Sequence, residues 1–184
     1  MRITAGKFKA KHVDTVKSQD VRPTSSKIRE SIFNIIQNRV SDSLMLDLFA
    51  GSGIIGLEAL SRGAKDVVFV EKNPKVLRVL KNNMTSFNLN SKVIFNDAIK
   101  ALDILKGSKF DIIFVDPPYA AGLYPEVLKK IKDNNLLADD GILILEHSSC
   151  DKFEQTAEEF NFEIQKSKQY GDTTLLFLEN KTHN

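Results

Sequence analysis

Short apolar runs alternate with helical patterns through most of the chain. The apolar runs predict buried strands at residues 44–49, 67–71, 93–96, 110–115 and 141–146. Between and after them, apolar spacing predicts helices at about 53–62, 74–88, 98–106, 124–133 and 152–160. Near-continuous apolar strands that alternate with helices are typical of a parallel sheet covered on both faces. We therefore expect an α/β fold.

The N-terminal segment departs from this alternation. Residues 1–16 interleave polar and apolar positions around Gly6-Lys7, which predicts two short strands in a small β-hairpin. Thr24, Ser25 and Ser26 are N-cap candidates for a following helix. One face of that helix would carry Ile28, Ile32, Ile35 and Ile36.

The C-terminal segment also differs. Strand-like runs at 162–169 and 173–179 flank Tyr170-Gly171-Asp172, which predicts a hairpin and an antiparallel last strand. Together with the five earlier runs, this gives a mostly parallel, seven-stranded sheet. Since 184 residues with 42% hydrophobic content suit one sizeable core, we expect a single domain over residues 1–184.

Composition predicts the cellular compartment of the protein and whether it has a membrane span or a metal site. No run of about 18 apolar residues is present, and the N-terminus lacks the apolar stretch of a secretory signal. The single Cys150 excludes an internal disulfide, and no His/Cys cluster has a zinc spacing. These features predict a cytoplasmic protein with no membrane span and no metal.

Charge is distributed unevenly. Residues 1–39 contain nine Lys or Arg against three acidic residues, whereas the remainder contains 17 basic and 21 acidic residues. A basic segment on a mildly acidic body indicates a polyanionic partner, although a solvated basic face has the same composition. We expect residues 1–40 to form a basic N-terminal part, with residues 41–184 as the core.

A glycine-rich loop follows the first long strand. Its glycines have the G-x-G-x-x-G spacing, which permits a tight turn and a close approach of a ligand to the backbone. The candidate ligand-binding residues here are Asp47, Phe49, Ala50, Gly51, Ser52, Gly53 and Gly56. This spacing does not distinguish a nicotinamide dinucleotide from S-adenosylmethionine, and ordinary helix–strand packing remains an alternative.

Acidic residues follow the next two strands. Glu71 ends its strand 20 residues after Gly51, where a carboxylate can accept hydrogen bonds from ribose hydroxyls. Asp97 and Ala98 follow the next strand, where an acid and a backbone N–H can bind adenine. Taken alone, Asp97 is more typical of an N-cap for the helix that follows, and it could serve both roles.

The most informative motif is Asp116-Pro117-Pro118-Tyr119, at the end of the strand 110–115. Proline has no N–H, so this loop presents carbonyl oxygens and a carboxylate but almost no donors. Such a cluster suits a substrate –NH2 group, which brings two donors. Tyr119 could stack on a base and fix it for attack. A rigid turn with an ordinary packed aromatic residue is the simpler alternative.

The chain resembles a known family at this point. Asp116-Pro117-Pro118-Tyr119 is similar to the catalytic motif of class I amino-methyltransferases. The segments 2–6 (RITAG), 22–24 (RPT), 28–34 (IRESIFN) and 47–53 (DLFAGSG) together resemble the RsmD family, bacterial 16S ribosomal RNA (guanine-N2) methyltransferases. The resemblance covers essentially the whole chain.

The resemblance implies a Rossmann-like class I methyltransferase fold. It implies S-adenosylmethionine at residues 47–56, 71 and 97–98, catalysis by residues 116–119, and a guanine target in the assembled small ribosomal subunit. The candidate RNA-binding residues are Arg2, Lys7, Lys9, Lys11, Arg22, Thr24 and Arg29. Family members often carry a second glycine in place of Ala5 and arginines in place of the three lysines. We expect a monomer.

Three alternatives stay open. An adenine-N6 methyltransferase could use the same tetrapeptide on RNA or DNA. A nicotinamide-dependent oxidoreductase could use the glycine loop and Glu71, but it would leave Asp116-Pro117-Pro118-Tyr119 unexplained. A non-catalytic RNA-binding assembly factor could use the basic N-terminal segment alone.

Overall fold

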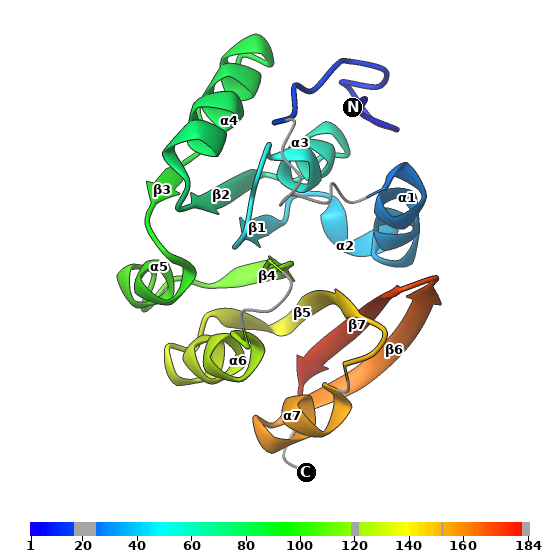
Figure 1. Ribbon diagram of the computed structural model, residues 1–184, viewed down its shortest axis with the longest axis vertical. Coiled ribbons are helices and arrows are strands. Elements are labelled where there is room, and N and C mark those ends of the chain that lie inside the picture. The colour runs from blue at the N-terminus through cyan, green and yellow to red at the C-terminus, as the bar shows by residue number, and fades with distance from the viewer. Residues whose placement is uncertain (17–24, 119–121, 152, 182–184) are drawn as a thin grey trace.

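The computed structural model describes residues 1–16, 25–118, 122–151 and 153–181, and within them the strands form one seven-stranded sheet (Figure 1). The strands are β1 (Leu44–Asp47), β2 (Asp66–Glu71), β3 (Val93–Phe95), β4 (Phe110–Val115), β5 (Leu137–Ser148), β6 (Phe162–Tyr170) and β7 (Thr173–Asn180). The helices are α1 (Ser26–Ile35), α2 (Gln37–Val40), α3 (Ile54–Ser61), α4 (Pro74–Ser86), α5 (Ala98–Ile104), α6 (Tyr124–Asp133) and α7 (Glu154–Glu159).

The order of the strands is β3-β2-β1-β4-β5-β7-β6. The first five are parallel to their neighbours, and β7 pairs antiparallel with both β5 and β6. This confirms the predicted mostly parallel sheet with an antiparallel C-terminal hairpin. The strand order reverses direction at β1, so the carboxyl ends of β1 and β4 flank the position where ligands bind in such sheets.

Helices cover both faces of the sheet, because alternate strand residues point to opposite sides. Met45 packs into a core with residues of α1, α3 and α4, whereas Leu46 packs into a second core with α5, α6 and α7. Both residues are at most 1% exposed. The near-continuous apolar runs in the sequence are therefore explained by burial of both faces.

The largest error among the predicted strand boundaries lies at β5. β5 begins at Leu137, not at residue 141, because Leu137 pairs with Phe110 before the register shifts to Ile112 and Ile142. Asp139 and Asp140 are exposed within this irregular start, so polar residues occupy strand positions that the apolar pattern could not identify.

The predicted N-terminal strands are also corrected. The ends of the segment pair through one isolated antiparallel bridge between Arg2 and His12, and residues 5–10 are turns and bends. The turn packs on α3 instead: Lys7 N donates to the Ser61 carbonyl at 2.8 Å. Gly6 has φ +81, and a Cβ there would lie 1.8 Å from the same oxygen. We call residues 1–16 the N-terminal loop.

The predicted first helix is confirmed. Ser25 accepts a hydrogen bond from Ile28 N at 3.2 Å and caps α1, and Ile28, Ile32 and Ile36 are buried. Among the described residues, no helix has the length and apolar character needed to cross a membrane.

Candidate active site

A pocket of about 270 Å³ lies at the carboxyl ends of the parallel strands. It is lined by Leu48, Phe49, Gly51, Val70, Glu71, Lys72, Asn73, Val76, Asn96, Ala98, Asp116, Pro117 and Pro118. Residues following β1, β2, β3 and β4 thus meet around one cavity, as parallel strand ends do in open α/β sheets. The pocket combines segments that are far apart in the sequence.

Some residues of the glycine loop line the pocket, and others pack against the core. Phe49 and Gly51 line the pocket, and no heavy atom beyond its chain neighbours lies within 4 Å of the position of a Cβ on Gly51. A Cβ on Gly53 would lie 2.4 Å from Leu80 Cδ1, and one on Gly56 would lie 2.3 Å from a Phe69 ring carbon. Gly53 therefore permits close packing against α4 and Gly56 permits close packing against β2, whereas Gly51 leaves open space.

Three further candidates, Ala50, Ser52 and Asp47, do not line the pocket but form hydrogen bonds that hold the glycine loop in place. Ala50 N donates to Val70 O at 2.9 Å, and the Ser52 carbonyl accepts from Asn83 Nδ2 at 2.9 Å. Asp47 is 1% exposed and accepts from Gly56 N at 3.1 Å. Burial, together with the negative charge of Glu71, outweighs that bond and raises the pKa of Asp47 to about 7.

Glu71 is fixed at the end of β2 by the backbone on both sides of the pocket. Its Oε2 accepts from Gly51 N at 3.0 Å, and its Oε1 accepts from Asn73 N at 2.7 Å. Asn73 in turn caps α4, whose first residue is Pro74. The carboxylate is thus held beside the glycine loop with a defined orientation.

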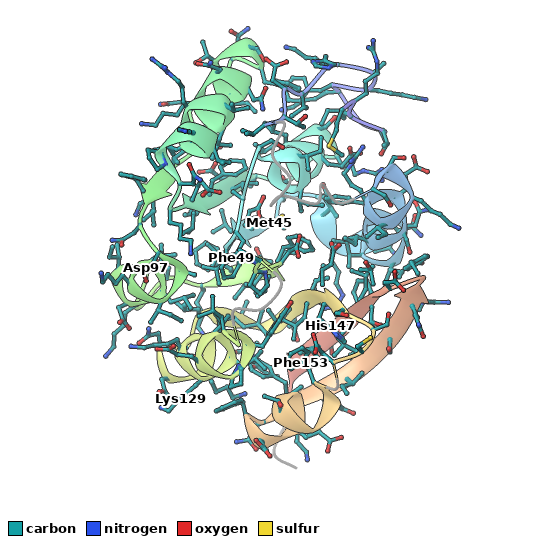
Figure 2. The ribbon with its side chains drawn as sticks, viewed as in Figure 1. Met45, Phe49, Asp97, Lys129, His147 and Phe153 are labelled. Carbon is teal, nitrogen blue, oxygen red and sulfur yellow. The ribbon has the colours of Figure 1, made fainter. Side chains whose placement is uncertain are left out.

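The strand end after β3 places its neighbours differently from the prediction. Asn96 and Ala98 line the pocket, but Asp97 does not, and Figure 2 shows it at the start of α5. Asp97 accepts from Lys100 N at 3.0 Å and caps the helix. That hydrogen bond lowers the pKa of Asp97. Of its two predicted roles, the structure shows the cap.

Asp116 directly follows β4 at the pocket and precedes Pro117 and Pro118 in the sequence. Desolvation raises its pKa well above the ordinary value, and the negative charges of Glu146 and Asp47 raise it further. Val115 pairs with Leu145, so Asp116 and Glu146 follow paired residues on neighbouring parallel strands. Glu146 is 6% exposed, and its backbone carbonyl accepts from Tyr124 Oη at 2.6 Å.

Sequence reasoning missed several lining residues. Lys72, Asn73 and Asn96 line the pocket but were not selected from the sequence. Their signal was position, because each stands within two residues of a predicted strand end. Tyr119, Arg22 and Thr24 lie outside the described residues.

The predicted RNA contacts separate into exposed and buried groups. Arg2, Lys7 and Lys9 are exposed on the N-terminal loop, and Lys11 is half-buried. The prediction that Arg29 binds RNA is wrong. Its side chain is 1% exposed, and its Nε pairs with Glu58 Oε2 at 3.2 Å. A guanidinium enclosed in this way has no surface to offer RNA.

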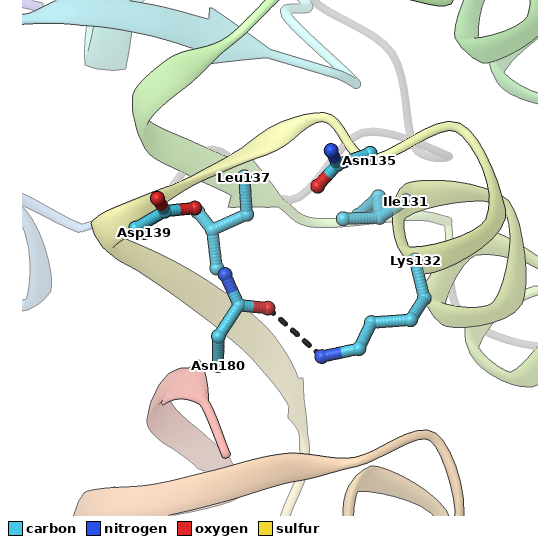
Figure 3. A pocket seen from close by; sticks show the side chains of 6 residues that line it. All are labelled: Ile131, Lys132, Asn135, Leu137, Asp139 and Asn180. Atoms are coloured by element: carbon cyan, nitrogen blue, oxygen red, sulfur yellow. Dashed lines mark hydrogen bonds between the residues drawn. The ribbon is translucent and has the colours of Figure 1, made fainter. Parts of the chain in front are cut away.

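A second hollow, of about 290 Å³, lies at the other end of β5 between α6 and the end of β7 (Figure 3). Its Lys132 Nζ donates to Asn180 Oδ1 at 2.9 Å and to Asn161 O at 3.0 Å. The ammonium is thus used to join α6 to the C-terminal hairpin, and none of the predicted site residues lines this hollow.

The profile of the family described as conserved hypothetical protein 95 matches residues 1–179, nearly the whole chain. This chain belongs to the RsmD family of methyltransferases. Ribosomal RNA small subunit methyltransferase D of Escherichia coli strain K12 is 35% identical over 147 residues, which are 79% of this chain and 74% of that protein.

Solved structures agree with the RsmD assignment. The Escherichia coli protein yhhF aligns with a TM-score of 0.85 and 27% identity, over 100% of this chain and 99% of that one. The Thermus thermophilus 16S rRNA N2 G1207 methyltransferase RsmC, solved with AdoMet and guanosine, aligns with a TM-score of 0.74. That alignment has 22% identity and covers 94% of this chain and 46% of RsmC, so it supports the fold. The predicted methyltransferase fold is confirmed.

Proposed function

We propose that this protein transfers a methyl group from S-adenosylmethionine to the exocyclic N2 amine of a guanine in 16S ribosomal RNA. One observation carries the proposal. The Asp116-Pro117-Pro118 loop forms one wall of a pocket, and Glu71 with the glycine loop lines the same cavity. Membership of the RsmD family supports the reaction and the substrate class.

The chemistry of the pocket fits the cofactor. Glu71 is oriented to accept hydrogen bonds from ribose hydroxyls, and the open space at Gly51 leaves room for a ligand against the backbone. Leu48, Val70 and Ala98 supply apolar walls for a flat ring. When bound, the cofactor supplies a methyl group on a positively charged sulfonium, which buried carboxyl groups nearby would stabilise.

Asp116 and its prolines would hold the substrate amine. Pro117 and Pro118 contribute no N–H donors, so the loop offers the Asp116 carboxyl and the backbone carbonyls as acceptors. Acceptors that hold both amine hydrogens out of the ring plane would direct the nitrogen lone pair away from the ring. Tyr119, next in the sequence, is proposed to stack on the base.

The raised pKa gives Asp116 a second use. A carboxylate that binds a proton more tightly than an ordinary aspartate is a better acceptor for the proton released from the methylated amine. Most of the rate enhancement would still come from positioning the two reactants.

The remaining proposals concern the setting. We place RNA phosphate on the N-terminal loop at Arg2, Lys7, Lys9 and Lys11, within a basic part of residues 1–40, and the cofactor in residues 41–184. The substrate would be the assembled small subunit, bound by a cytoplasmic monomer.

Methyl transfer from labelled S-adenosylmethionine to small subunits from cells lacking the gene tests the reaction. Label should appear in N2-methylguanosine, and Asp116→Asn should reduce it by about 10²–10³-fold, the loss typical when one group that stabilises a transition state is removed. Asp111→Asn is a matched control, because Asp111 is exposed at the other end of β4 and its Oδ2 only accepts from Leu44 N. Label in N6-methyladenosine would contradict the base assignment, and no label in subunits or free 16S RNA would contradict the proposal.

A further inference from the structure

Helix α4 has a strongly basic outer face. Lys75, Arg78 and Lys81 are exposed and stand three residues apart, and Lys72 precedes them with the same spacing. Residues three apart on a helix are neighbours on its surface, so Lys75, Arg78 and Lys81 form one stripe, and Lys72 stands just before the N-cap Asn73 at the start of α4. No aspartate or glutamate occurs between residues 72 and 96. The stripe is therefore a concentrated positive charge without acidic residues in its own segment.

The stripe is not required for packing. α4 binds to the sheet through its opposite face, where Val76, Leu77, Leu80 and Met84 are buried. Like charges at this spacing repel one another and weaken an isolated helix. A purely structural surface would gain from intervening acids, as α6 shows with Lys129–Asp133 and Lys130–Asp103. Among the described residues, the α4 cations have no such ion pair.

α4 connects the pocket with the N-terminal loop. At its start, Lys72 and Asn73 line the pocket. At its end, Lys11 Nζ donates to Ser86 O, and the rings of Phe8 and Phe87 meet edge to face at 5.0 Å. Figure 1 shows the loop and α4 at the same end of the molecule. Thirteen residues at about 1.5 Å each make the connection roughly 20 Å long.

An exposed aromatic residue lies at the same edge. Phe95, the last residue of the edge strand β3, is 58% exposed and pairs in register with Glu71, the residue before Lys72. An exposed apolar ring near the start of a row of cations is a combination that binds single-stranded nucleic acid, with phosphates on the cations and a base stacked on the ring. An acidic protein surface would need the cations but not the ring.

We propose that Lys72, Lys75, Arg78 and Lys81 form a phosphate-binding track that leads the ribosomal RNA backbone from the N-terminal loop to the pocket. The inference rests on the proposed function, because it takes RNA as the substrate. It extends the RNA-binding surface to a helix that belongs to the cofactor-binding core.

The triple variant Lys75→Gln/Arg78→Gln/Lys81→Gln tests the track. The matched control is Lys106→Gln/Lys129→Gln/Lys130→Gln, which removes the same charge from the side of the molecule where Lys129 lies (Figure 2). Binding to protein-free 16S RNA and to small subunits is measured against salt concentration. Loss of three phosphate contacts should lower the slope of log affinity against log salt by about 2–3 and weaken binding at least about tenfold at 0.1 M salt. The control should bind as the wild type does.

Separate readouts distinguish this inference from the proposed reaction. Cofactor binding by the triple variant should be unchanged, and its methyl transfer should show a raised KM for RNA with a nearly unchanged kcat. If the triple variant and the control have the same slope and affinity, the track is wrong, whatever the activity. If only binding to whole subunits weakens, the partner of the stripe is an acidic protein surface and the RNA track is wrong. Absence of methyl transfer by the wild type, with the slope difference intact, would overturn the reaction and leave the track supported.

Discussion

Acids with shifted pKa values lie in two different parts of the molecule: Glu58 in α3 beneath the N-terminal loop, and Asp47 and Asp116 near the pocket. Glu58 is fully buried and surrounded by donors: Thr4 N and Oγ1, Ala5 N, and the guanidinium groups of Arg29 and Arg62. Burial alone would raise its pKa, but the hydrogen bonds from Thr4 and Arg62 outweigh burial, and the pKa of Glu58 is lowered.

The pocket acids show the opposite balance. Burial raises the pKa of Asp47 and of Asp116, and among the described residues neither forms an ion pair with a cation. A carboxyl group that is desolvated without a compensating cation weakens the fold unless something else supplies the charge. The difference teaches that Glu58 is a structural acid whose charge the chain itself compensates, whereas the described part of the chain supplies no cation to Asp47 or Asp116. We propose that a cationic ligand in the pocket compensates Asp116, which lines it.

The largest effect that tests this contrast is a loss of folding stability when the ion pair of Glu58 is broken. Arg29→Met removes one partner of a buried ion pair and also the bond from Arg29 Nη2 to the Arg2 carbonyl, at 2.7 Å. Removing one partner of a buried ion pair costs about 3–5 kcal/mol. Because Arg62 and Thr4 still donate to Glu58, we expect a loss at the lower end of this range. Urea unfolding monitored by circular dichroism should show that loss.

Arg39→Met is the matched control for this prediction. Arg39 also pairs with a glutamate, Glu179, but its side chain is 41% exposed. Partly exposed pairs contribute at most about 1 kcal/mol. Equal losses in the two variants would show that Glu58 is not a special structural acid.

A smaller effect is expected on the pocket side. Glu71→Gln keeps one oxygen for Gly51 N but turns an amide donor toward Asn73 N, and it removes the charge offered to the ribose. A hydrogen bond to a charged group contributes about 1.5–3 kcal/mol, so S-adenosylmethionine affinity should fall about 10–100-fold. Isothermal titration calorimetry measures this, with Glu126→Gln on exposed α6 as the control. A change below about threefold would remove Glu71 from the cofactor site.

Sequence patterns predicted the sheet well because its strands are buried on both faces. Each parallel strand reads as an apolar run, and each pocket segment follows such a run. The start of β5 was missed because Asp139 and Asp140 are exposed, and local polarity then resembles a turn. A different pattern misled the prediction for the N-terminal loop: alternating polar and apolar residues predicted strands, but backbone hydrogen bonding to Ser61 on α3 replaced regular strand pairing.

The roles of single residues were harder to predict, because tertiary partners decide them. Arg29 reads as a surface cation in a basic segment, and its partner Glu58 is 29 residues away in the chain. Within the G-x-G-x-x-G pattern, only the folded structure separates Gly51, which faces the pocket, from Gly53 and Gly56, which face the core. A sequence motif therefore predicts the location of a site more reliably than the role of each residue in it.

The pH dependence of stability without cofactor, which changes gradually over several pH units, is the most direct test of the contrast. Asp47 has its pKa raised from 3.8 to about 7 in the folded protein, so the folded state holds the proton more tightly than the unfolded chain. The associated stability is present below about pH 4 and is lost as the pH rises through about 7, by at most about 1.4 kcal/mol per pH unit for one proton.

Glu58 has the opposite sign, since its lowered pKa gives stability that is present above its ordinary value of 4.5 and is lost as the pH falls. The two groups of acids should therefore act in different pH windows.

In denaturant titrations at pH 4.5–8, Asp47→Asn, which can still accept from Gly56 N, should become progressively more stable relative to the wild type as the pH rises to 7. S-adenosylmethionine should stabilise the wild type more at pH 8 than at pH 5, because ionised pocket acids attract its sulfonium. A stability difference between Asp47→Asn and the wild type that stays constant over this range would mean that Asp47 is as fully compensated as Glu58, and the contrast would fail.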